Sequence, residues 1–211
     1  MGYFTLKKEA YAELTEKRSR FLARVCPVKS EEEALMFLES IRRDHTATHH
    51  VFAYRLRENN FARYNDDGEP GGTAGLPVLD VLERGGLTDA IIVVSRWFGG
   101  TLLGTGGLVR AYSSAAKMGV QAAGIVEMEM AGKYHLNVSY SDYDRVMRIA
   151  RECGVSISYT DFKEDVFMEI IATDGPAFRF SDSIRELTRG KNEMILQEKE
   201  YLPIGEKRFS E

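Results

Sequence analysis

The run from Ser95 to Tyr112 constrains the fold of this chain more than any other stretch. It follows the most apolar segment, Ala90 to Val94, and passes into a pattern typical of a helix. A buried strand, a glycine-rich turn and a helix start form the arrangement in which backbone N–H groups face an anion. The run therefore predicts an anion-binding site, with candidate residues Arg96, Trp97, Gly99, Gly100, Gly104, Gly106, Gly107 and Arg110.

This glycine-rich turn departs from both standard nucleotide-binding motifs. Gly99 and Gly104 have the P-loop spacing, but Thr105 stands where that motif requires lysine. The dinucleotide-binding fingerprint fails as well, because Val109 stands where a third glycine is needed. The alternative to an anion site is a tight turn that needs positive φ angles and close packing of helix on strand.

The side chains around the turn also carry two interpretations each. Arg96 and Arg110 suit bidentate contacts to phosphate, but either could instead pair with an acid of the loop near Asp66. Trp97, the single tryptophan, could stack on a nucleobase or belong to the core.

A second group of residues is predicted to line a pocket beside the turn. Its carboxylates could act in acid–base chemistry or bind magnesium, or they could simply form an acidic turn. Carboxylates beside Arg96 would suit a zwitterionic or phosphorylated ligand. The candidate pocket residues are His49, Tyr54, Asp66, Asp67 and Glu69.

Three histidines, His45, His49 and His50, invite a metal site. The segment is predicted to run from loop into strand, where His49 and His50 point to opposite sides. A closed zinc site needs four ligands, and the two cysteines lack metal-like spacing. We therefore predict no metal, no cofactor and no catalytic residue.

Composition limits the function classes. The net charge of −4 argues against nucleic-acid binding by bulk positive charge, although clustered arginines can still bind RNA. The longest apolar run, Ala90 to Val94, is far short of a membrane span. Cys26 and Cys153 lie far apart in the sequence and are predicted to be reduced thiols of a cytoplasmic protein.

The hydrophobic pattern predicts an α+β protein with two domains, residues 1–130 and 131–211. In the first, Ser30 and Glu33 form a capping box before a helix whose apolar face includes Leu35. The other elements expected there are an initial hairpin, a strand over 46–56, a loop over 59–75, a short helix near 78–82, a strand over 90–94 and a helix after 107. The second domain alternates as βαββαβ, the ferredoxin-like order.

Three segments are specific enough to indicate a family: ATHHVFAYRL (47–56), DDGEPGGTAGLPVLDVL (66–82) and VVSRWFGGTLLGTGGLVRAY (93–112). With these motifs the chain resembles the IMPACT/YigZ family along nearly its whole length. The resemblance implies a first domain with the fold of a small-subunit ribosomal protein domain and of domain IV of elongation factor G. It implies a second domain like domain V of that factor, and a general link to translation.

The leading hypothesis is a non-enzymatic, translation-linked protein that binds RNA or the ribosome through the glycine and arginine turn. One alternative is a small-molecule enzyme that acts on a phosphorylated ligand. The other is a pure protein-interaction module, parallel to the eukaryotic relatives.

Overall fold

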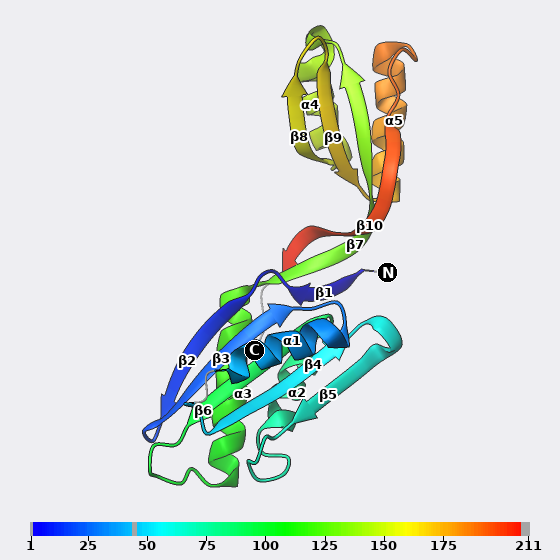
Figure 1. Ribbon diagram of the computed structural model, residues 1–211. Helices are drawn as coiled ribbons and strands as arrows, with labels where there is room; N and C mark the ends of the chain where they lie inside the picture. The colour runs from blue at the N-terminus through cyan, green and yellow to red at the C-terminus, as the bar shows by residue number, and fades with distance from the viewer. Residues whose placement is uncertain (1, 44–45, 208–211) are drawn as a thin grey trace. The chain divides into compact units, whose positions relative to one another are not determined.

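The computed structural model describes residues 2–43 and 46–207, and in that part of the chain it contains two β-sheets and five α-helices (Figure 1). The α+β class is confirmed at this level. The chain divides into two compact units. One is Tyr3–Glu127 with the segment that begins at Ile204, and the other is centred on Met128–Pro203.

The first unit is built on a five-stranded sheet in the order β2-β3-β6-β4-β5, with antiparallel neighbours. Its strands are β2 (Ala10–Glu16), β3 (Ser19–Pro27), β4 (His49–Leu56), β5 (Phe61–Asn65) and β6 (Ala90–Trp97). A short strand, β1 (Tyr3–Leu6), precedes them. The most apolar segment of the sequence, in β6, is thus the central strand.

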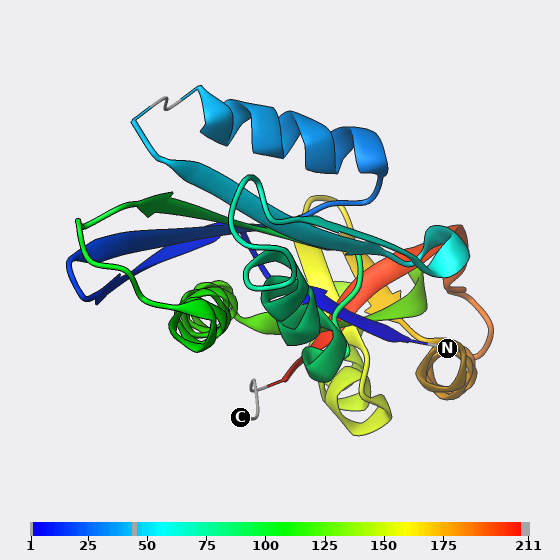
Figure 2. The same cartoon turned by 90° about the horizontal axis from the view of Figure 1, so that it is seen from below.

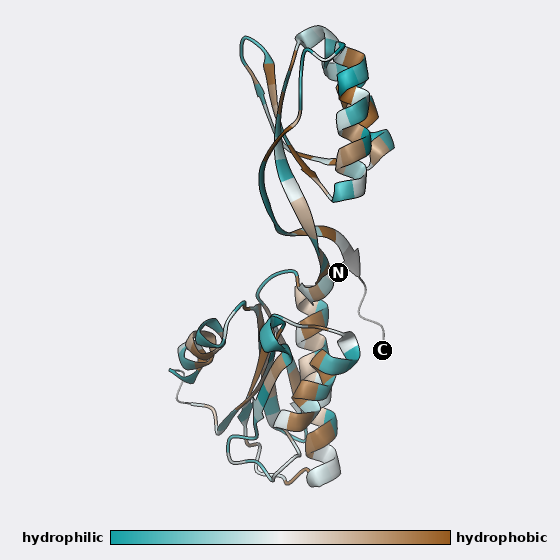
Figure 3. Ribbon diagram, turned by 90° about the vertical axis from the view of Figure 1, so that its right-hand side faces the viewer, coloured by the Kyte–Doolittle hydropathy of each residue, from teal (hydrophilic) through white to brown (hydrophobic). Residues whose placement is uncertain are grey.

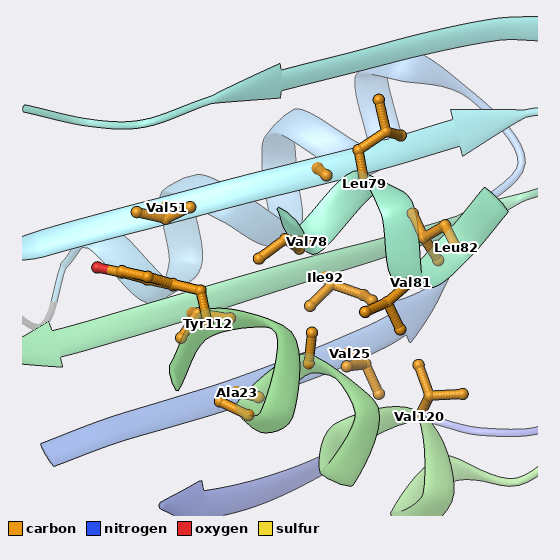
Figure 4. Packing of buried hydrophobic residues seen from close by; sticks show 14 of the residues in the cluster. Ala23, Val25, Val51, Val78, Leu79, Val81, Leu82, Ile92, Tyr112 and Val120 are labelled. Atoms are coloured by element: carbon orange, nitrogen blue, oxygen red, sulfur yellow. The ribbon is translucent and has the colours of Figure 1, made fainter. Parts of the chain in front are cut away.

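Helices cover both faces of this sheet. Helix α1 (Glu31–Arg42) lies on one face, and α2 (Gly75–Gly85) and α3 (Thr105–Ala123) lie on the other (Figure 2). Alternate residues of β4 serve the two sides: Val51 and Ala53 join the core with α2 and α3, whereas Phe52 and Tyr54 pack with α1. Figure 4 shows the larger of these cores, where α2 and α3 meet the sheet.

The hairpin between β2 and β3 closes through a turn of only two residues. Glu16 pairs with Ser19, which leaves Lys17 and Arg18 as the turn, with φ angles of 45° and 68°. Positive φ at both central positions defines a type I′ turn, the geometry that matches the twist of paired strands. Both turn side chains are exposed.

Three details of the first unit test the sequence patterns. The capping box is confirmed, because the Glu33 N–H donates to Ser30 Oγ at 3.2 Å. Leu35, expected on the buried face of α1, is instead 38% exposed. The expected loop over 59–75 contains a 3₁₀ turn (Glu58–Asn60) and strand β5, whose residues are all exposed at the sheet edge. An exposed edge strand has no apolar alternation to reveal it.

The second unit follows the predicted element order. Its elements are β7 (Ile125–Val138), α4 (Tyr140–Cys153), β8 (Ser156–Phe162), β9 (Val166–Ala172), α5 (Asp174–Thr188) and β10 (Ile195–Lys207). Its sheet has the order β1-β7-β9-β8, and β10 also pairs with β7, so that β10, β7, β9 and β8 follow one another as neighbours. Figure 3 shows the hydrophobic stretches on strands and helices that form the cores of the two units.

Candidate functional site

A buried carboxylate lies at the centre of the predicted pocket. Glu69 Oε1 accepts a hydrogen bond from Tyr112 Oη at 2.7 Å and forms an ion pair with Arg96 Nη1 at 2.5 Å. Tyr112 belongs to α3 and Arg96 to β6, so this one oxygen joins the 66–75 loop to the sheet and to a helix. Burial, and then the bond to Glu69, raise the pKa of the Tyr112 hydroxyl well above its usual range, which keeps it a donor.

Arg96 is 5% exposed and forms an ion pair with Glu69, which favours the second of its two interpretations, while phosphate binding by Arg96 stays a prediction. Its charge is already balanced by Glu69, and its guanidinium lies 5.4 Å from the Phe21 ring and 5.7 Å from the Phe98 ring. Its Nη2 donates to Ser19 Oγ at 3.4 Å. Its Nε is buried and has no hydrogen-bond partner within the described chain.

The carboxylates of the 66–75 loop do not form a pair, because each one accepts hydrogen bonds from different groups. Asp66 accepts hydrogen bonds from the N–H groups of Gly72, Ala74 and Gly75 at 2.8–3.0 Å, and so caps the start of α2. Asp67 accepts from the His50 N–H at 2.6 Å and fixes the loop to β4. Of the three acids, Glu69 is the one that faces the pocket.

The Asp66 cap leads to a direct prediction. We expect Asp66→Ala to lower the free energy of unfolding by about 1–2 kcal/mol, because the N–H groups at the start of α2 lose their acceptors. The control is Asp80→Ala on the same helix, where an exposed i,i+4 pair with Arg84 is worth less than about 0.5 kcal/mol. Urea unfolding compares the two, and equal losses would contradict the capping role.

His49 lies beside Glu69, as predicted. Its Nδ1 is 2.7 Å from the carbonyl oxygen of Asp67, and a carbonyl only accepts, so Nδ1 carries the proton. The other ring nitrogen, Nε2, is 3.9 Å from Glu69 Oε1. With the proton of the neutral ring on Nδ1, Nε2 is a hydrogen-bond acceptor.

Tyr54 does not line this pocket, which corrects the prediction. It is five residues from His49 along β4 and therefore on the other face of the sheet, where it is fully buried in the core with α1. Its hydroxyl donates to Glu31 Oε1 at 2.6 Å. Burial, and then this bond, raise its pKa to about 12.

The glycines of the turn divide into two kinds. Gly99 lies against the backbone of Arg18 and Ser19, so closely that a Cβ would overlap the Arg18 carbonyl group. Gly100 and Gly104 have φ angles of 80° and 71°, which other residues rarely adopt. Close packing therefore explains Gly99, and the positive φ angle alone explains Gly100 and Gly104, which have no atom within 4 Å of an added Cβ. Gly106, by contrast, lies in the first turn of α3, where an added Cβ would make only an ordinary 3.8 Å contact with Arg110 Nη1.

The predicted cradle of backbone N–H groups is only partly present. The N–H groups of Phe98 and Gly99 donate to Thr48 Oγ1 and Ser19 Oγ, at 3.3 and 3.2 Å. The N–H groups of Thr105, Gly106 and Gly107, which open α3, have no acceptor in the described part of the chain. The open donors are therefore at the helix start, beyond the turn.

Two cavities lie beside this helix start, and Leu103 lines both of them. The larger, of about 390 Å³, has a polar side with Thr48, His49, Glu69 and Arg96, and is otherwise lined by Pro70, Phe98, Leu102, Leu103, Gly104, Thr105 and Leu108. The smaller, of about 260 Å³, is lined by Leu14, Glu16, Lys17, Leu103, Gly107, Arg110, Ala111 and Ser114. Lys17 and Arg110, from segments far apart in the sequence, thus face the same cavity.

Trp97 is half-buried and lies outside the hydrophobic cores. Its Nε1 donates to Thr46 Oγ1 at 3.0 Å, and the Arg20 guanidinium lies over its ring at 4.5 Å. Phe98 is the more open aromatic, with 49% of its surface exposed. Stacking of a base on Trp97 stays a prediction, and Phe98 is a further candidate.

Sequence patterns missed the contribution of the hairpin turn. Lys17 and Arg18 lack the Asn-Gly signature of a type I′ turn, so their position beside the glycines was not visible. No group of three or more metal-ligating side chains lies within residues 2–43 and 46–207, and His45 is outside those ranges. None of the helices described is long and apolar enough to cross a membrane.

The fold and site define a two-unit α+β protein with a buried glutamate–arginine pair beside a glycine turn. The Impact N-terminal domain family matches residues 17–120. IMPACT family member YvyE of Bacillus subtilis (strain 168) is 36% identical over 203 residues, covering 95% of this chain and 94% of that protein. YigZ of Escherichia coli (strain K12) is 30% identical over 183 residues, covering 85% and 90%.

The chain therefore belongs to the IMPACT family, as its motifs predicted. A crystal structure of a hypothetical protein covers 94% of this chain and 98% of its own, with 28% identity and a TM-score of 0.59.

Proposed function

We propose that this chain is a translation-linked regulatory protein, without catalytic activity, that binds RNA or the ribosome at the start of α3. The observation that carries the proposal is the convergence of Lys17 and Arg110 on one cavity beside helix N–H groups that have no acceptor in the described chain. Cations and the positive end of a helix dipole together favour phosphate.

The support for phosphate contacts comes from where the cationic side chains lie and not from the total charge of the chain. Arg110 is exposed, its Nη1 lies near Gly106 of the first helical turn, and no ion pair holds it within the described residues. Arg18 is also exposed and its backbone lies against Gly99. The net charge of the chain is −4, so binding depends on this local cluster.

The link to translation is supported by family membership, and the motifs imply in addition that the two units resemble domains IV and V of elongation factor G. The second unit has the element order and strand order of a ferredoxin-like fold, as domain V would. In this proposal the first unit contacts phosphates, and the second unit contacts RNA or protein.

The test is filter binding of a structured RNA across a salt series. We expect Arg110→Ala to weaken binding several-fold and to reduce the slope of log K against log [salt] by about 0.7–0.9, the value for one lost phosphate contact. The matched control is Arg84→Ala, which removes the same charge from the other helix on that face, at its last turn. A salt-independent affinity, or equal losses for both variants, would overturn the proposal.

A further inference from the structure

The larger cavity contains polar groups whose bonding capacity is unused. The hydrogen bond and the ion pairs of Glu69 all fall on Oε1, which leaves Oε2 without a partner in the described chain. Arg96 Nε is buried without an acceptor, and His49 Nε2 faces the same space. A buried N–H without a partner is rare in native proteins, so Arg96 Nε, beside a carboxylate oxygen and an imidazole nitrogen that also lack a hydrogen bond, points to a ligand in this cavity.

The other residues that line the larger cavity are apolar and suit the flat ring of a ligand. Pro70, Leu102, Leu103 and Leu108 line the cavity together with the half-exposed ring of Phe98. A volume of about 390 Å³ lies within the range of small-molecule sites, which is roughly 300–1,000 Å³. An aromatic wall and a polar floor are the features with which proteins hold unstacked nucleobases.

The start of α3 supplies the complement for an anionic group. Gly104 and Thr105 line the same cavity, and Leu103 separates it from the cavity that contains Lys17 and Arg110. A ligand whose base entered the larger cavity would therefore have its phosphate next to the open helix N–H groups. A nucleotide has both a flat base for the cavity and a phosphate for the helix start, and the two groups are close enough together to occupy both places.

We propose that the cavity binds a single nucleotide whose base carries an exocyclic amino group, with its phosphate at the start of α3. The acceptors Glu69 Oε2 and His49 Nε2 select for amino donors, which adenine, cytosine and guanine have. Uracil has a carbonyl oxygen in place of the amino group and offers only a single ring N–H donor between two carbonyl oxygens. The inference rests on the proposed function for its phosphate site and names the part of RNA that this site takes.

Leucine-methyl NMR of the full chain tests this directly. AMP, CMP and GMP are expected to shift the methyl signals of Leu102, Leu103 and Leu108 in a saturable way, with UMP at least about tenfold weaker. Inorganic phosphate and adenosine alone should each bind more weakly than AMP. Leu35, which is exposed on α1 on the opposite face, is the internal control. Equal binding of UMP, or no shift at the three leucines, would overturn the inference.

Because Glu69 substitutions also affect folding, the variant of choice is Phe98→Ala. It removes the open aromatic wall and is expected to weaken AMP binding at least fivefold. Phe178→Ala, at an exposed phenylalanine of α5 in the second unit, should leave it unchanged. Equal weakening by the two variants, or by neither, would contradict a site at Phe98.

Oligonucleotides distinguish a free nucleotide from one within RNA. If the site takes a base of RNA, A10 binds more tightly than U10, and Phe98→Ala removes that preference while the salt slope stays. If AMP binds but A10 and U10 are equal, the ligand is a free nucleotide. Salt-dependent RNA binding without any nucleotide effect would sink this inference and leave the proposed function standing. Nucleotide binding without salt-dependent RNA binding would do the reverse.

Discussion

Glu69→Leu is expected to lower the free energy of unfolding by about 3–5 kcal/mol, the largest effect of any single substitution in the site. The reason is the state of its partner. Arg96 is 5% exposed, and without Glu69 its charge would be buried with no counterion in the described chain. Tyr112 would lose its acceptor as well.

A double-mutant cycle measured by urea unfolding identifies the source of this loss. Adding Arg96→Met to Glu69→Leu is expected to recover much of the stability, because two apolar side chains replace a buried ion pair at little net cost. The surface control is Glu39→Ala, whose exposed pair with Arg42 is worth at most about 0.5 kcal/mol. If the double variant is no more stable than Glu69→Leu, the unpaired charge is not the cause.

Gly99→Ala is expected to cost about 3 kcal/mol or more, the second of the two large effects. An added methyl group would overlap the carbonyl group of Arg18, and a backbone contact of this kind is relieved only by moving the β2–β3 turn or the glycine loop. The same displacement would shift Lys17 and Arg18 relative to α3. The variant should therefore lose RNA affinity along with stability.

Gly106→Ala is the matched control for that substitution. It lies seven residues further on, inside α3, and its added Cβ would meet only Arg110 Nη1, at an ordinary 3.8 Å. Alanine is the better helix former by about 1 kcal/mol, so this variant should be as stable as the parent chain or more so. Thermal or urea unfolding gives both values. Comparable destabilisation of the two variants would show that close packing at Gly99 does not explain its effect.

The sequence predicted those elements well whose formation depends on neighbouring residues in the chain. The capping box at Ser30 and Glu33 fixed the start of α1, and strict alternation revealed the strands of the second unit. Strand β5 was missed because its residues are exposed on both sides and its pairing with β4 is a tertiary contact. Leu35 shows the same limit, since one apolar residue at the margin of a helical face can remain at the surface.

The candidate site was predictable as a set of residues but not as an arrangement. Sequence reasoning offered Glu69 among three acids as a partner for Arg96, and the structure selects it. It did not separate the cap at Asp66 from the strand contact at Asp67, because adjacent residues diverge only once the loop is folded. Tyr54 was predicted to line the pocket because it is close to His49 along β4. The side of the strand to which its side chain points places it in the core with α1 instead.

The hairpin that joins β2 to β3 places lysine and arginine at two adjacent positions with a left-handed backbone, at a cost on the order of 1 kcal/mol each that Asn-Gly would avoid. Laboratory evolution for heat resistance would therefore favour exchanging both residues. The exchange of Lys17 would also remove a cation from the cavity at the start of α3. A thermostabilised descendant of this chain would therefore be a poor choice for testing the proposed binding of RNA.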